Sequence, residues 1–344
     1  MNILGIDTSC DDTSAAVIAD GRTVLSSVVN TQVKLHHPYG GVVPELASRE
    51  HIRNIVPVVE EALSRAGLGT GDLEGVAVTV GPGLIGSLLV GLYYAKGLAF
   101  VNRIPLVGIN HLEGHILSVL LEENTPEFPF VALTVSGGHT SLYHVKGIGY
   151  YSLMGQTLDD AAGEAFDKVA KILGLGYPGG AVLEAMARSG RKDRINFPRA
   201  FLSPESLDFS FSGLKTSVSL FVGKWQESTM RQEEITKNDI AASFQEAVID
   251  VLVQKLIRAR EKTGVGSIAL AGGVACNTVL RKRMREEADD RGIGLYFPRP
   301  EYCTDNGAMI ALAGYHRILG GEKADLTIDV RSRYPIEDLE PLIS

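Results

Sequence analysis

The stretch NILGIDTSCDDTSAAVIADGRTVLSSVV, residues 2–29, decides the fold class. Short apolar runs at residues 2–6, 15–19 and 23–29 alternate with polar turns, a pattern that predicts consecutive β-hairpins. Residues 130–145, FVALTVSGGHTSLYHV, repeat the plan of strand, turn and strand. Two copies of this plan predict an internal duplication in which each copy begins one domain.

The rest of the chain alternates strands with helices. The runs VAVTV (76–80) and LVGIN (106–110) each precede a helical stretch, which favours an α/β fold with a mostly buried sheet. We expect one domain over residues 1–125, with a C-terminal helix at 305–320 packing back on it. A second domain is expected over residues 126–304, with a helical insertion at about 185–238; a helix near 52–63 is expected to kink at Pro57, and a long amphipathic helix to start at 239.

Composition indicates an ordinary soluble enzyme. Of 344 residues, 45% are hydrophobic and 22% charged, and the net charge is −8, so the summed field does not attract nucleic acid. An RNA partner would need a local basic patch or a second protein. We expect a cytoplasmic protein, because no leader and no apolar run of membrane-spanning length is evident, with unpaired cysteines at 10, 276 and 303.

The motif HLEGH at residues 111–115 raises the question of a metal. His111 and His115 share one helix face, so both rings can reach a single ion, although an ordinary histidine pair has the same spacing. Glu113 lies about 200° round the helix from His111, which excludes it as the base of a helix metalloprotease. Asp305 is either the N-cap of the final helix or a third ligand, in a set that suits Fe²⁺ and also Zn²⁺. The competing ligands are His36, His37 and His139.

Four polar or glycine-rich turns follow apolar strands: DTSCDDTS, GPGLIG, SGGHTS and GGVACN. Glycine lets backbone N–H groups approach an anion, so together these turns suggest a phosphate or nucleotide cleft, while each alone is equally typical of a tight hairpin. Asp11 and Asp12 suit a hydrated divalent ion or a general base, and Asx-turn capping explains them equally well.

These stretches together resemble the TsaD (Gcp, YgjD) family of tRNA threonylcarbamoyladenosine transferases. The matching motifs include GIDTSCDDTSAAV, TVGPGLIGSLLVG, NHLEGH, DDAAGEAFDKVAKILGLGYPGG, FSFSGLKT and CTDNGAMIA, and they span residues 3–313. The resemblance implies two duplicated RNase H-like α/β domains of the actin, Hsp70 and sugar kinase superfamily, with a nucleotide cleft between them. It also implies transfer of a threonylcarbamoyl group from threonylcarbamoyl-AMP to the N6 amine of the adenosine 3′ of the anticodon, in tRNAs reading ANN codons, with release of AMP.

The resemblance also assigns site residues. It makes His111, His115 and Asp305 the ligands of one divalent metal, Fe²⁺ or alternatively Zn²⁺. It places an adenine nucleotide or threonylcarbamoyl-AMP on Thr134, Val135, Ser136, Gly137, Gly138, Asp167, Gly180, Glu184 and Asn277. Asp11 or Asp12 is the expected proton acceptor. Many members read ETSCDE where this chain reads DTSCDD, so the reach of Asp7 and Asp12 differs by one methylene; the role of Lys215 in FSGLKT is open.

Partners would reconcile the acidic chain with a tRNA substrate. The basic run RSGRKDRINFPR, residues 188–199, can hold phosphates or be a solvated loop. The resemblance implies an inactive paralogue (TsaB), a small P-loop ATPase (TsaE) and a separate synthase that supplies threonylcarbamoyl-AMP. The alternatives are a nucleotide-dependent scaffold or ATPase of the same superfamily, and a metalloprotease acting on glycoproteins, which the position of Glu113 disfavours.

Overall fold

The computed structural model describes residues 1–201, 203, 205–227 and 235–342. The chain divides into two compact units. Unit 1 comprises residues 1–128, 145–152 and 296–344, and unit 2 comprises residues 129–144 and 153–295.

The predicted N-terminal hairpins form one side of the sheet of unit 1. Strands β1 (Asn2–Asp7), β2 (Asp12–Ala19) and β3 (Thr23–Thr31) pair antiparallel. Strands β4 (Gly75–Gly81) and β5 (Leu106–Asn110) then add in parallel to β1, giving the order β3-β2-β1-β4-β5. The carboxyl ends of β1, β4 and β5 therefore share one edge of the sheet, where ligands of α/β sheets bind.

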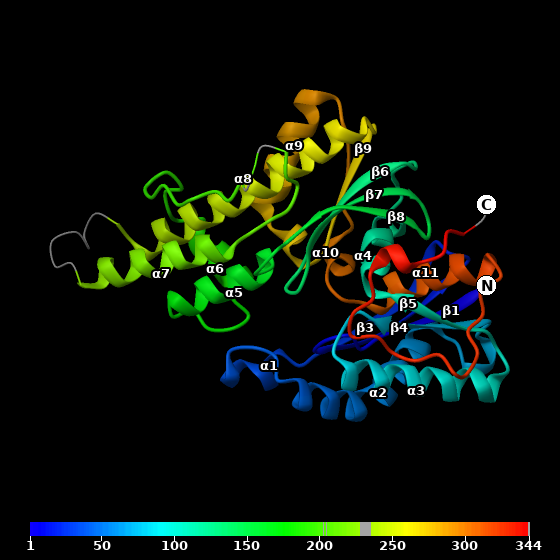
Figure 1. The fold of residues 1–344 in the computed structure, drawn as a ribbon. Helices are drawn as coiled ribbons and strands as arrows, with labels where there is room; N and C mark the ends of the chain where they lie inside the picture. Colours follow the sequence, from blue (N-terminus) through cyan, green and yellow to red (C-terminus); the bar gives the residue numbers. More distant parts are fainter. Residues whose placement is uncertain (202, 204, 228–234, 343–344) are drawn as a thin grey trace. The chain divides into compact units, whose positions relative to one another are not determined.

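Helices cover both faces of this sheet (Figure 1). Helices α2 (Pro44–Ala66) and α3 (Ile85–Asn102) pack on one face, with Val59, Leu92 and Val78 in a shared core. Helix α11 (Gly307–Leu319) packs on the other face against β1, β2 and β4. Pro57 lies inside α2, which continues through it. The short helices of this unit are α1 (Val33–His36), α4 (His111–Leu117) and α10 (Pro300–Cys303).

Helix α3 is the one helix, in the part of the chain that the structure describes, with the length and apolar composition of a membrane span. A third of its 18 residues are buried. The signal is weak, because helices that pack in the core of a soluble protein meet the same criterion, and Leu88, Leu92 and Ala95 face the core here.

Unit 2 is built around the second copy of the hairpin plan. Its sheet runs β10-β9-β6-β7-β8, from β6 (Phe130–Val135), β7 (Thr140–Gly147), β8 (Tyr150–Gln156), β9 (Ser267–Ala271) and β10 (Gly294–Tyr296). Read from β8, this order repeats that of the first sheet, and β6 pairs with β9 in parallel as β1 does with β4. The repeated topology confirms the predicted duplication. The helices of the second half are α5 (Ala162–Ile172), α6 (Gly180–Ala187), α7 (Ser212–Glu227), α8 (Lys237–Thr263) and α9 (Thr278–Arg291).

The first segment of unit 1 ends at Phe128, and unit 2 begins at Pro129. Unit 1 additionally contains residues 145–152 and everything from Tyr296 onward. Within the expected insertion at 185–238, the structure describes α7 and the loops around it, while residues 202, 204 and 228–234 lie outside the described residues.

Candidate functional site

Helix α4 begins at the carboxyl edge of the first sheet because Asn110, the last residue of β5, caps it. The Asn110 Oδ1 accepts hydrogen bonds from the N–H of Leu112 (2.9 Å) and of Glu113 (3.4 Å). Its Nδ2 donates to the carbonyl of Tyr334 at 2.9 Å, which fixes the cap in place. This cap sets His111 as the first residue of the helix.

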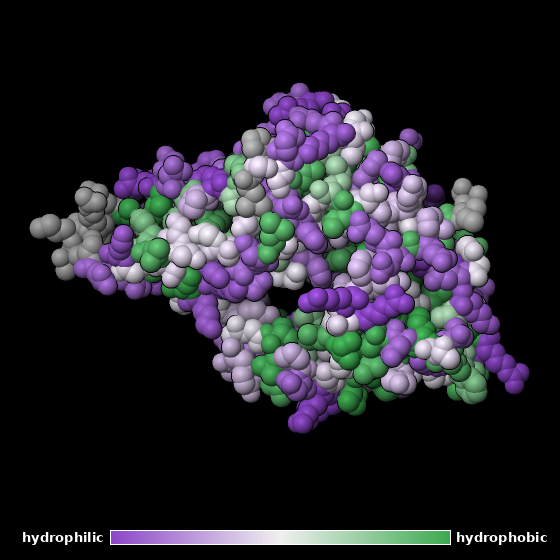
Figure 2. All heavy atoms as spheres, viewed as in Figure 1, coloured by the Kyte–Doolittle hydropathy of each residue, from purple (hydrophilic) through white to green (hydrophobic). Residues whose placement is uncertain are grey.

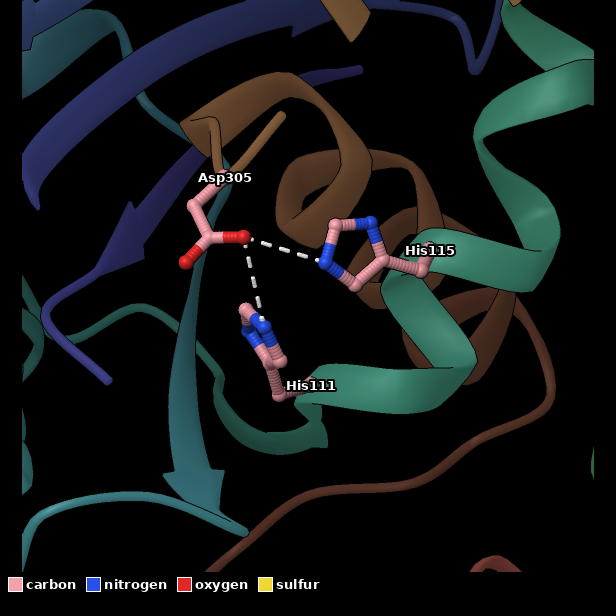
Figure 3. A group of neighbouring side chains, drawn as sticks. All are labelled: His111, His115 and Asp305. Atoms are coloured by element: carbon pink, nitrogen blue, oxygen red, sulfur yellow. Dashed lines mark hydrogen bonds and ion pairs between the residues drawn. The ribbon is translucent and has the colours of Figure 1, made fainter. Parts of the chain in front are cut away.

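His111, His115 and Asp305 come together as one candidate metal group (Figure 3). Asp305 Oδ1 lies 3.1 Å from His115 Nε2 and 3.5 Å from His111 Nε2. All three ligand atoms lie within 4.8 Å of one another. Ligands bonded at about 2.1 Å to one ion stand roughly 3.0 to 3.4 Å apart. The two distances from Asp305 Oδ1 lie near that range, so the group can hold a single divalent ion with open positions.

The structure decides whether Asp305 caps α11 and whether other histidines belong to the candidate metal group. The N-cap of α11 is Asn306, whose Oδ1 accepts from the N–H of Met309 at 2.9 Å, so Asp305 is not the cap. His36 is buried and bonds Gln32 at 3.2 Å. The candidate group does not include His36, His37 or His139.

A carboxylate and a hydroxyl orient His111. The His111 Nδ1 lies 3.3 Å from Asp7 Oδ2 and 3.2 Å from Ser9 Oγ, which leaves Nε2 turned toward Asp305. Although burial opposes the charged ring, Asp305 and Asp7 raise the pKa of His111 well above its usual value. The charge of His111 in turn holds the pKa of Asp305 well below its usual value, against the effect of burial. The sequence did not indicate that Asp7 serves His111.

Asp11 and Asp12 are the candidate bases beside this group. Burial raises the pKa of Asp12 to about 7, and the negative charge of Asp305 adds to the rise. Burial also raises the pKa of Asp11. Asp12 Oδ1 is buried without a hydrogen-bond partner among the residues that the structure describes. A carboxyl in this state can accept a proton near neutral pH.

The loop at residues 136–139 of unit 2 is closed on itself. The N–H of Ser136 donates to the carbonyl of His139 (2.8 Å), and the N–H of His139 donates to Ser136 Oγ (3.1 Å). Among the described residues, no heavy atom other than those of the glycine and its chain neighbours lies within 4 Å of the position that a Cβ would take at Gly137 or Gly138. The backbone at these glycines is therefore open to a ligand.

Hydrogen bonds connect this loop to the other residues expected to hold the donor, all of them in unit 2. The N–H of Gly163, in α5, donates to Ser136 O at 3.2 Å. Further along α5, Asp167 Oδ1 accepts from the N–H of Gly179 at 2.7 Å, directly before Gly180.

A further hydrogen bond connects α6 to the start of α9. Glu184 Oε1 accepts from the N–H of Thr278 at 3.0 Å, next to Asn277. Asn277 caps α9 through Oδ1 and donates from Nδ2 to Gln245 at 2.9 Å. Thr134 and Val135 end the buried strand β6 that leads into the loop. Hydrogen bonds thus link the expected donor-binding residues from the loop at 136–139 through α5 and α6 to the start of α9.

Two further features were not predicted. Lys215 pairs with Asp160 at 3.0 Å, and Lys168 pairs with the same carboxylate at 2.7 Å, so the lysine of FSGLKT serves an ion-pair cluster. Glu113 points away from the metal group, as its position in the helix predicted; the unpredicted feature is that it is fully buried and bonds Arg317 and Tyr151. Neither arrangement has a local signal in the sequence, because each joins residues far apart in the chain.

The sequence of this chain is similar to that of known proteins along nearly its whole length. The chain matches the family model TsaD, tRNA N6-adenosine threonylcarbamoyltransferase, over residues 23–312. It is 51% identical to the enzyme of that name from Syntrophus aciditrophicus (98% of each chain) and 56% identical to that from Desulforapulum autotrophicum (97% of this chain, 99% of the other).

Solved structures agree on the fold. Full-length HypF matches with a TM-score of 0.60 at 15% identity, over 91% of this chain and 54% of the other. Component A of the (R)-2-hydroxyglutaryl-CoA dehydratase from Acidaminococcus fermentans matches with a TM-score of 0.54 at 16% identity, over 93% and 99%. These likenesses and the repeated strand order agree with the predicted fold, a pair of duplicated RNase H-like α/β domains. On the family model and on relatives that match nearly the full length, the chain belongs to the TsaD family of tRNA N6-adenosine threonylcarbamoyltransferases.

Proposed function

We propose that this protein transfers the threonylcarbamoyl group of threonylcarbamoyl-AMP to the N6 amine of the adenosine 3′ of the anticodon, in tRNAs reading ANN codons, with release of AMP. The observation that carries the proposal is the match to tRNA N6-adenosine threonylcarbamoyltransferases over nearly the whole chain. The grouping of His111, His115 and Asp305 and the open backbone at Gly137 and Gly138 support it.

The donor is assigned to the residues gathered in unit 2. Backbone N–H groups at Gly137 and Gly138 suit the phosphate, because an open glycine loop can approach an anion closely. Asp167 and Glu184 supply carboxylate oxygens for ribose hydroxyls. Each already accepts a backbone hydrogen bond that fixes its position, from Gly179 and Thr278 respectively.

One divalent ion, Fe²⁺ or alternatively Zn²⁺, is assigned to His111, His115 and Asp305. When bound it supplies a Lewis acid that polarises an oxygen of the donor. Asp7 and Ser9 keep the Nε2 of His111 directed toward Asp305 by holding its Nδ1.

The proton of the reaction is assigned to Asp12, with Asp11 as the alternative acceptor. The N6 lone pair attacks the carbamoyl carbon, the bond from that carbon to the phosphate oxygen breaks, and AMP leaves with the bonding electrons. An exocyclic amine conjugated to adenine is a poor nucleophile, so the amine loses its proton as the new bond forms. A carboxylate whose pKa is about 7 is suited to accept it.

Partners complete the proposal: tRNA, the inactive paralogue TsaB, the P-loop ATPase TsaE and a separate synthase for the donor, all in the cytoplasm with no membrane. Figure 2 shows hydrophobic side chains over the region of α2 and α3 in unit 1. Tyr93 is 64% exposed and Val101 is 76% exposed on α3, and Ile52 is 63% exposed on α2. An apolar face of this kind supports a protein partner rather than tRNA.

The test supplies labelled threonine, bicarbonate, ATP, unmodified tRNA and the full partner set, with and without this protein. Label is expected on tRNA only when the protein is present, and the His115→Ala variant is expected to lose at least 100-fold in rate. Label that appears at the same rate without this protein would overturn the proposal and favour the scaffold reading. If Asp11→Ala and Asp12→Ala both keep the wild-type rate, only the base assignment fails.

The protease alternative loses its chemical basis at Glu113. This carboxylate accepts two hydrogen bonds from Arg317 and one from Tyr151, and none of its side chain is exposed. It cannot activate a water beside the two histidines from that position.

A further inference from the structure

The glutamate of HLEGH is the feature that the proposed reaction leaves unused. Glu113 lies between His111 and His115 in α4, yet it faces the opposite side of the helix and is fully buried. Burying a lone carboxylate costs several kcal/mol, so its partners must compensate for lost water.

Two partners hold Glu113 through three hydrogen bonds. Arg317 Nε donates to Oε2 at 2.8 Å and Arg317 Nη2 donates to Oε1 at 2.9 Å, a bidentate pair. The hydroxyl of Tyr151 donates to Oε1 at 2.9 Å. Arg317 is itself only 3% exposed, and its Nη1 donates to Glu322 at 2.6 Å. A bidentate pair fixes orientation as well as distance.

The pair joins the two helices that flank the metal group. His111 and His115 belong to α4, and Asp305 lies two residues before α11, which carries Arg317 in its last turn. Arg317 stands about 15 Å along the axis of α11 from its first residue. The ion pair and the Asp305 contacts therefore bind α4 at separate points along the same neighbouring element.

Between these points the two helices pack tightly. A Cβ at Gly114 would lie 2.9 Å from the Cδ1 of Ile310 and 3.2 Å from the Cγ of Met309, both on α11. Apolar packing of this kind tolerates small rotations of a helix, whereas a bidentate pair has one geometry.

We propose that Glu113 and Arg317 are positioning residues that fix the rotation of α4 against α11, and so set the distances between His111, His115 and Asp305. Tyr151 supports the pair from β8. The inference rests on the metal assignment above, and it adds a function for a residue that contacts neither metal nor substrate.

The test compares metal binding in the full-length chain, measured as the dissociation constant for Zn²⁺ in competition with a chelator and as the visible spectrum of the Co²⁺ form. The main variant is the double substitution Glu113→Leu with Arg317→Met, which replaces a buried ion pair by apolar side chains of similar volume and keeps the core stable. We expect a thermal midpoint near that of the wild type, Zn²⁺ affinity weakened about 10-fold or more, and altered Co²⁺ band positions.

Two further variants keep the result interpretable. Tyr151→Phe removes one hydrogen bond and leaves the pair, so it is expected to weaken Zn²⁺ binding by about 2- to 5-fold in a folded protein. The control is Arg283→Met, which removes the partner of Asp250 and Glu246 in unit 2 and should leave both readouts unchanged.

The outcomes separate the two proposals. The metal assignment fails, together with this inference, in either of two cases: the wild-type chain binds neither Zn²⁺ nor Co²⁺, or His111→Ala leaves the binding intact. If the wild type binds and the folded variants at 113, 317 and 151 match it within twofold with the same Co²⁺ spectrum, only the positioning role is overturned. Should the double variant not fold, Tyr151→Phe decides by the same criterion.

Discussion

Three aspartates in the first turn of the chain are chemically alike and differ through their surroundings. Asp7 is 1% exposed and lies beside His111 Nδ1, where it orients a candidate ligand. Asp12 is partly buried, and its Oδ1 has no hydrogen-bond partner within the described ranges. Asp7 thus orients a ligand while Asp12, five residues later, is a candidate base. Burial and neighbouring charges determine the proton affinity of a carboxyl, so such a difference is expected.

The raised pKa of Asp12 predicts a stability change with pH in the metal-free protein. The pKa rises from 3.8 to about 7 on folding, so the folded state holds this proton more tightly and loses that advantage as pH climbs from about 4 to above 7. Asp12→Asn should therefore be more stable than the wild type at pH 8, by at most about 4 kcal/mol, with the difference shrinking toward pH 4.

Thermal unfolding at pH 5 and pH 8 in the presence of a chelator checks this prediction. The exposed Asp193 gives a matched control, because Asp193→Asn should show the same small difference at both values. A gap between Asp12→Asn and the wild type that stays constant or narrows with rising pH would contradict the raised pKa.

Because Asp7 contacts His111, we predict that Asp7 affects the affinity for metal although it is not one of the candidate ligands. Asp7→Ala leaves Ser9 alone on Nδ1, so the ring loses its charged anchor and Zn²⁺ affinity should fall about 10- to 100-fold. Chelator competition measures the change. Asp20→Ala, at the exposed end of the same hairpin, is the control that should leave affinity unchanged; an equal loss in both variants would refute a specific role for Asp7.

At the scale of elements, the sequence predicted what depends on neighbours in the chain. The hairpins of β1 to β3 and β6 to β8 follow from local alternation, and the start of α4 follows from the residues around Asn110. Contacts between distant residues carry no such pattern. Ser9 and His111 are 102 positions apart, and Glu113 and Arg317 are 204 apart, so their pairing depends on how β1, α4 and α11 stack. Asp305 entered the predicted site through family resemblance, since spacing alone left it as a possible cap.

The packing of α5 behind the loop at 136–139 gives a prediction about two glycines. A Cβ at Gly163 would lie 2.5 Å from Ser136 O, whereas a Cβ at Gly138 would have no described atom within 4 Å apart from those of its chain neighbours. Gly163→Ala should therefore destabilise unit 2 by about 1 to 3 kcal/mol, because backbone must shift. Gly138→Ala should keep the wild-type midpoint and weaken AMP binding.

Chemical denaturation and calorimetric titration with AMP distinguish these outcomes. Each variant serves as the control for the other. Both add one methyl group, one in the loop at 136–139 and one in α5 behind it. The reverse ranking, with Gly138→Ala the less stable protein and Gly163→Ala the weaker binder, would refute an open loop at 138.

At the scale of the whole molecule, the net charge and the pairing of the cations limit the affinity for tRNA. The net charge is −8, and the cations of the basic run at 188–199 are largely paired. Arg191 pairs with Asp239, Lys192 with Glu246 and Arg199 with Asp250. Cations committed to α8 carboxylates offer little net field to a phosphate backbone. The proposal therefore assigns the positive surface that tRNA needs to a partner of this chain.

These pairings predict the behaviour of Arg199. Its guanidinium is 23% exposed and bonds Asp250 at 2.9 Å and 3.0 Å, so Arg199→Ala should cost about 1 to 2 kcal/mol of folding stability. Because the cation is already neutralised by Asp250, tRNA affinity should change less than twofold. The measurement is the salt dependence of tRNA binding by fluorescence anisotropy, for the chain alone and with its partners. If Arg199 contacts a phosphate, the slope of log K against log salt should be smaller by about one in Arg199→Ala than in the wild type. That outcome would show that Arg199 binds tRNA, against this prediction.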